Sequence, residues 1–197
     1  MDTYLTIKAA AEAQLTEKRS RFLAFAHHVD NEEEARSLLA QYKKTYHDAR
    51  HVCYAYVIGA EAETVRANDD GEPSGTAGRP ILGQISSRNL CYTMVAVVRY
   101  FGGVKLGTGP LGVAYKTVAS QVLDEAETRE CIVTSEWRME VPYADADVAM
   151  RFVREAKAQI TARDYTLTGV VLSVCVRRDD RQALHDRLEK ILTLRFL

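Results

Sequence analysis

Three carboxylates, Asp69, Asp70 and Glu72, stand almost side by side in the sequence. Carboxylate oxygens bind hard divalent cations, and grouped carboxylates can act as general acid and base. The same side chains also cap loops and helices and form ion pairs, for which Arg79 and Arg99 are candidate partners. We favour the capping and ion-pair interpretation, so no catalytic residue and no metal site is assigned. A small hydrolase that uses this acidic loop is the alternative.

Most of the chain's 11 glycines lie in two stretches, residues 69–80 and 99–112, and each stretch leads into a segment with helical character. Helix N-termini present unpaired N–H groups and a positive dipole end, and glycine lets ligand oxygens approach the backbone. The pattern predicts an anion- or nucleic-acid-binding surface, although the glycines could instead serve tight turns and helix packing. The candidate residues are Arg79, Arg99, Lys105, Gly102, Gly103, Gly107, Thr108 and Gly109.

One of these stretches also matches the dinucleotide-binding pattern G-x-G-x-x-G, at residues 107–112. In that motif an acidic residue ends a second strand, whereas here Asp124 falls at the end of the same predicted helix. A phosphate-binding P-loop is excluded because no Gly-Lys-Ser/Thr occurs.

The four cysteines form no C-x-x-C pair, and we interpret them as reduced residues of the core. We therefore predict no cofactor.

The composition is that of a globular protein with a substantial core, at 47% hydrophobic and 27% charged residues. The net charge of −1 gives no general attraction to nucleic acid, so such binding would need a local basic patch. The N-terminus has no signal-peptide design, and no apolar run approaches the roughly 20 residues that span a bilayer. We expect a cytoplasmic protein without membrane contact.

The order of predicted elements favours an α+β protein with two domains, residues 1–128 and 131–197. In the first domain we expect the following elements: two strands in 3–29, a helix capped by Asp30 or Asn31, a strand at 52–58, a loop at 59–78, a short helix at 80–87, a buried strand at 92–100 and a long helix capped by Thr108. A linker follows at 125–130. In the second domain we expect strands at 131–141, 159–166, 172–176 and 191–197, with helices at 144–158 and from Asp179/Asp180 to 190. This βαββαβ order is the ferredoxin-like arrangement.

Several motifs resemble those of a known family. They are Asp69-Asp70-Gly71-Glu72-Pro73-Ser74-Gly75-Thr76-Ala77-Gly78-Arg79-Pro80, Val98-Arg99-Tyr100-Phe101-Gly102-Gly103, Leu106-Gly107-Thr108-Gly109, Arg19-Ser20-Arg21-Phe22 and Ala49-Arg50-His51. Together they resemble the IMPACT family, in particular its bacterial YigZ/YvyE type. The resemblance covers about residues 15–126, and the tail from residue 131 resembles the family's smaller C-terminal domain.

The resemblance implies a fold and a setting for each domain. The first would be similar to domain 2 of small-subunit ribosomal protein S-five, a sheet with helices on one face, and the second to a ferredoxin-like domain of elongation factor G. Eukaryotic members of the family regulate translation. We therefore expect a non-enzymatic protein that binds RNA or a ribosome-associated protein and regulates translation. A small hydrolase and a protein-interaction module are the alternatives.

Overall fold

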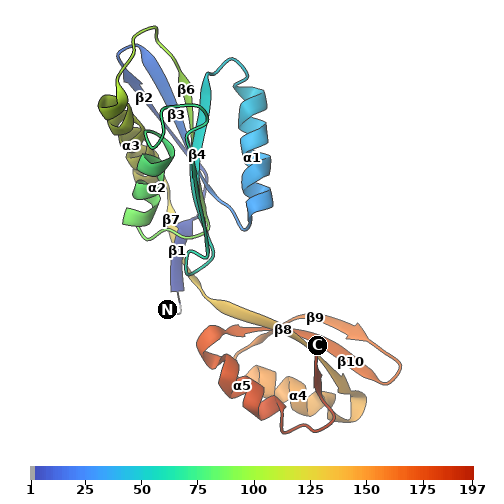
Figure 1. Cartoon of the computed structure of the whole chain (residues 1–197). Coiled ribbons are helices and arrows are strands. Elements are labelled where there is room, and N and C mark those ends of the chain that lie inside the picture. The colour runs from blue at the N-terminus through green and yellow to red at the C-terminus, as the bar shows by residue number, and fades with distance from the viewer. Residues whose placement is uncertain (1–2) are drawn as a thin grey trace. The chain divides into compact units, whose positions relative to one another are not determined.

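The computed structural model describes residues 3–197 (Figure 1). The chain forms two compact mixed α/β units, Tyr4–Cys131 and Ile132–Leu197, with Thr3 grouped with the latter. Within the described residues, no helix combines the length and apolar character that crossing a bilayer requires.

The first unit is built on an antiparallel sheet with helices on both faces. Its strands, in spatial order, are β2 (Ala11–Glu17), β3 (Ser20–His28), β6 (Thr93–Tyr100), β4 (His51–Ile58) and β5 (Thr64–Asn68). Helix α1 (Glu32–Thr45) covers one face, and α2 (Gly78–Ser87) and α3 (Thr108–Glu125) cover the other (Figure 1). The expectation of helices on one face only is therefore wrong, because α1 buries a second core.

Strand β6 is the centre of this sheet and is buried on both faces. Val95 and Val97 pack into the core under α2 and α3, whereas Met94 and Val98 pack into the core under α1. The apolar run in the sequence predicts such a strand, because a strand covered on both sides cannot alternate apolar with polar residues. Arg99 follows Val95 and Val97 on the α2/α3 face, near the end of the strand.

Helix α1 begins where its sequence predicts. The Asn31 side chain accepts a hydrogen bond from the Glu34 backbone N–H at 2.9 Å, and three glutamates occupy the first turn. Both features stabilise the positive end of a helix.

Other boundaries differ from the predictions. Residues 3–28 form three strands rather than two, because a bend at residues 8–10 divides the first predicted strand. Lys18 and Arg19 adopt positive φ angles and form the turn between β2 and β3. Strand β1 (Thr3–Ile7) pairs with β7 (Thr128–Ile132), which overlaps the expected linker. Strand β5 lies in the expected loop. Thr108 is the first residue of α3 and not its cap, which is Gly107 with a φ of 83°.

The second unit has the element order β8 (Thr134–Pro142), α4 (Tyr143–Glu155), β9 (Gln159–Tyr165), β10 (Gly169–Arg177), α5 (Arg181–Leu188) and β11 (Arg195–Phe196). Its antiparallel sheet has the order β11-β8-β10-β9, and both helices pack on one face. Asp179 and Asp180 lie in a 3-10 turn before α5. Asp180 is the N-cap residue of α5, as expected, but its side chain forms no capping hydrogen bond. The last strand is shorter than predicted.

Glycine is required at Gly102, just after β6, by a close approach of two backbone segments. A Cβ atom there would lie 2.1 Å from the carbonyl oxygen of Arg19 in the β2–β3 turn. This contact holds the exit of β6 against the turn that precedes β3.

We therefore predict that Gly102→Ala lowers the free energy of unfolding by about 1–3 kcal/mol through overpacking. Gly83→Ala is the matched control, since Gly83 lies inside α2 with no atom within 4 Å of an added Cβ. That change should raise stability by about 0.5–1 kcal/mol through helix propensity. Chemical denaturation of both variants measures the difference, and equal stability of Gly102→Ala and wild type would contradict the packing argument.

Candidate functional site

The two glycine-rich stretches meet around one cavity of about 440 Å³ in the first unit. Its walls are the 71–73 turn, Arg50 and His51 at the start of β4, Arg99 and Phe101 at the end of β6, and residues 105–108 at the entry to α3. Segments that are distant in sequence thus contribute to a single site.

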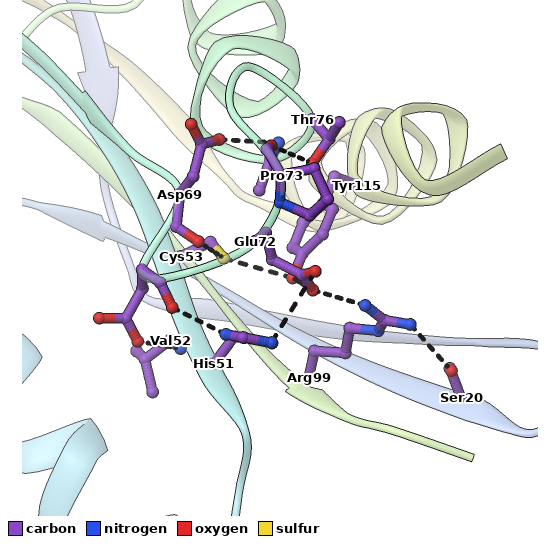
Figure 2. A network of polar contacts seen from close by, with 12 residues as sticks. Ser20, His51, Val52, Cys53, Asp69, Glu72, Pro73, Thr76, Arg99 and Tyr115 are labelled. Carbon is purple, nitrogen blue, oxygen red and sulfur yellow. Dashed lines mark hydrogen bonds and ion pairs between the residues drawn. The ribbon is translucent and has the colours of Figure 1, made fainter. Parts of the chain in front are cut away.

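A buried ion pair forms part of the cavity wall. Arg99 Nη1 donates to Glu72 Oε1 at 2.6 Å, and the two side chains are only 7% and 4% exposed. The Tyr115 hydroxyl of α3 donates to the same oxygen at 2.8 Å, and Arg99 Nη2 donates to Ser20 Oγ at 3.3 Å (Figure 2). Because an unpaired charge is costly to bury, each of these partners stabilises the others.

His51 stands next to this pair with one ring nitrogen fixed. Its Nδ1 lies 2.7 Å from the Asp70 carbonyl oxygen, which can only accept, so Nδ1 carries a hydrogen. Its Nε2 lies 3.8 Å from Glu72 Oε2 (Figure 2). The position of His51 follows from the sheet register, which places it directly opposite Arg99.

Tyr115 and Cys53 complete the network below Glu72. Burial, reinforced by Cys53 and Glu72, raises the pKa of the Tyr115 hydroxyl well above its ordinary value. Burial also raises the pKa of the Cys53 thiol, whose sulfur lies 3.3 Å from the Tyr115 hydroxyl oxygen. Tyr115 is therefore a hydrogen-bond donor, and Cys53 is a protonated thiol that is poorly suited to act as a nucleophile.

The other two carboxylates of the acidic group point to different partners. Asp69 accepts hydrogen bonds from the backbone N–H groups of Gly75, Ala77 and Gly78 at 2.8–3.0 Å, and thereby caps the N-terminus of α2. Burial alone would raise the pKa of Asp69, but these three hydrogen bonds lower it below its ordinary value. Asp70 binds Lys43 and the backbone N–H of Val52.

The carboxylates of Asp69, Asp70 and Glu72 thus mainly cap a helix and form ion pairs, and of these three only Glu72 lines the cavity. The expected ion pair with Arg99 is present, whereas Arg79 forms none with any described residue. The three carboxylates do not converge as metal ligands. Potential ligand atoms of His185, Asp186 and Glu189 lie within 4.8 Å of one another in the second unit, but two of these side chains are exposed, and such groups are common without a metal.

The predicted anion-binding residues divide into two sets. Those that line the cavity are Arg99, Lys105, Gly107 and Thr108. Those outside its lining are Arg79, Gly102, Gly103 and Gly109. Arg50 and Tyr115 were not among the predicted site residues, because only the pairing of β4 with β6 and the packing of α3 bring them to the site.

Positive charge exceeds negative charge around the cavity. Arg50, Arg99 and Lys105 face a single carboxylate, Glu72. Neither Arg50 nor Lys105 has an ion-pair partner among residues 3–197. Helix α3 also begins at this wall with no side-chain cap and no acidic residue in its first turn, so its dipole adds to the positive potential.

The buried pair yields a stability prediction. Arg99→Met leaves the Glu72 charge buried with its main partner removed, so we expect it to cost about 3–5 kcal/mol in free energy of unfolding. Adding Glu72→Gln should restore part of the loss, which a double-mutant cycle by chemical denaturation measures. The control is Arg138→Met, which removes an exposed pair with Asp164 and should cost less than about 1 kcal/mol. Equal costs for the two arginine substitutions would contradict this assignment.

Comparison with known proteins places the chain in a family. The family model of the Impact N-terminal domain matches residues 18–123. IMPACT family member YvyE of Bacillus subtilis is 44% identical over 124 residues, which are 63% of this chain and 57% of that protein. IMPACT family member YigZ of Escherichia coli is 32% identical over 84% of this chain and 82% of its own length. A solved structure described as a hypothetical protein aligns with 100% of this chain and 97% of its own, with a TM-score of 0.77 and 29% identity. The chain belongs to the IMPACT family.

Proposed function

We propose that the cavity between residues 71–73 and 105–108 binds the phosphate groups of RNA, and that the protein acts without catalysis as an RNA- or ribosome-binding factor that regulates translation. The observation that carries the proposal is the gathering of Arg50, Arg99, Lys105 and the uncapped start of α3 around one cavity with a single carboxylate. Such an excess of positive charge and free N–H groups favours an anion.

The size and walls of the cavity favour a nucleotide unit over a small inorganic anion. A volume of about 440 Å³ lies in the range typical of organic ligands. Phe101 forms part of the wall, is 41% exposed and lies within cation–π distance of Arg50. An exposed aromatic ring beside cationic groups suits a base stacked next to its phosphate.

The folds suggested by the family resemblance are consistent with this setting. We infer that the second unit is ferredoxin-like, which its βαββαβ order and its sheet order β11-β8-β10-β9 support. We also infer that the first unit is similar to domain 2 of small-subunit ribosomal protein S-five in its sheet and in helices α2 and α3, and that α1 on the opposite face is a difference. We further infer that the protein works in the cytoplasm, where translation occurs. Because a fold does not determine function, the cavity and not the fold carries the proposal.

The hydrolase alternative receives less support from the geometry. It needs Asp69, Asp70 and Glu72 in one cleft, but Asp69 caps α2 and Asp70 is held by Lys43 and β4. The site therefore offers one carboxylate where that mechanism needs several.

The test is the salt dependence of RNA binding by charge-removed variants. Lys105→Gln should weaken binding of a short single-stranded RNA and reduce the slope of log K against log salt by about 0.7–1, since one phosphate contact is lost. Arg79→Gln is the matched control, because Arg79 also follows a glycine-rich stretch but lies outside the cavity lining. The RNA affinity of Arg79→Gln, and its slope of log K against log salt, should stay near those of wild type.

Fluorescence anisotropy over a series of salt concentrations gives both quantities. A flat salt response of the wild type, or no RNA binding at low salt, would overturn the proposed function. An equal loss in the two variants would show that the cavity is not the site.

A further inference from the structure

One oxygen of the buried Glu72 carboxylate has no hydrogen bond within the described residues. Oε1 accepts from both Arg99 and Tyr115, whereas the nearest polar group to Oε2 is His51 Nε2 at 3.8 Å. That distance is too long for a hydrogen bond. Glu72 lines the cavity and Oε2 is not fully buried, so this unpaired oxygen is an acceptor available to a donor on a ligand there.

His51 Nε2 offers the complementary group. With Nδ1–H committed to the Asp70 carbonyl, Nε2 is the nitrogen that lies toward Glu72 at the cavity wall (Figure 2). When Nε2 is protonated, it and Oε2 present one donor and one acceptor 3.8 Å apart. A hydroxyl group fits such a pair, because it accepts one hydrogen bond and donates another.

A carboxylate would not be needed if the cavity bound only phosphate. Glu72 neutralises Arg99 and repels any anion that approaches Oε2, so it weakens a pure anion site. It becomes useful if the ligand carries a hydroxyl beside its phosphate. In RNA the 2′-hydroxyl is next to the 3′-phosphate on every nucleotide, and it is the group by which proteins distinguish RNA from DNA.

We propose that Glu72 Oε2 and His51 Nε2 bind the ribose 2′-hydroxyl of a nucleotide whose phosphate lies against Lys105 and the start of α3, so that the cavity selects RNA over DNA. This inference rests on the proposed RNA-binding function and adds a specificity determinant to it. The hydroxyl donates to Glu72 and accepts from Nε2–H of His51, which is then an imidazolium because Nδ1 also carries a hydrogen. No covalent bond is made or broken.

The first test changes the ligand and not the protein. A substitution of Glu72 would also remove the ion pair that connects the 71–73 turn to β6. Three single-stranded oligouridines of equal length, carrying 2′-hydroxyl, 2′-fluoro or 2′-hydrogen groups, are titrated into the full chain by anisotropy. The 2′-fluoro sugar keeps an RNA-like pucker but cannot donate. Loss of a hydrogen bond to a charged group should weaken binding of both modified strands roughly tenfold or more.

The outcomes separate this inference from the function on which it rests. If all three strands bind equally, or if the 2′-fluoro strand binds as tightly as RNA, hydroxyl recognition is overturned while phosphate binding stands. If none binds at low salt, the proposed function itself fails.

Substitutions in the protein provide an independent readout. Glu72→Gln should bring the ratio of RNA to DNA affinity close to unity, whereas Lys105→Gln should weaken both ligands equally and preserve the ratio. Thermal unfolding establishes that each variant is folded, and the ligand series decides the question if Glu72→Gln is not. A ratio unchanged in a folded Glu72→Gln variant would overturn the assignment.

Discussion

The site depends on the buried ion pair between Glu72 and Arg99. It joins a loop residue to the end of the central strand, and Tyr115 extends the same contact to α3. Arg99 also contacts Ser20 and lies over the ring of Phe22, so the pair reaches β3 as well. Loop, sheet and helix are therefore held by one desolvated group of charges, and the cavity exists because these three elements are fixed together. A pair of this kind is expensive to break, which suits a wall that must keep its shape.

Patterns among neighbouring residues predicted those helices and strands that depend on neighbouring residues alone. The apolar run of β6, the Asn31 cap of α1 and the alternation of helices and strands in the second unit all follow from neighbouring residues. Elements that depend on distant partners were missed. Strand β1 forms because β7 lies beside it, and the partly exposed β5 is a strand because its backbone pairs with β4. The N-cap residue of α2 is Ala77, but the side chain that accepts its N–H hydrogen bond is that of Asp69, eight residues earlier. Sequence rules for helix caps consider only residues adjacent to the helix start, so they do not predict this contact.

The same distinction applies to the site. Glu72, Arg99, Lys105 and Thr108 could be identified as chemically capable residues, and they line one cavity. Arg79 has the same charge and lies in the first turn of a helix, yet it is outside the lining, because proximity in sequence does not fix where a side chain lies. His51 and Arg50 join the site through the register of β4 against β6. Glycines that look equivalent also differ in role: Gly102 permits a close approach to Arg19, whereas Gly107 supplies a positive φ at the start of α3.

The central claim is that RNA binds in this cavity. The most direct measurement is a titration of isotopically labelled full-length protein with a short single-stranded RNA, followed through backbone amide chemical shifts. The account predicts that the largest changes occur at Gly71, at Phe101 and at residues 105–108, which line the cavity. Changes confined to residues 132–197, or to the first unit away from these residues, would contradict it.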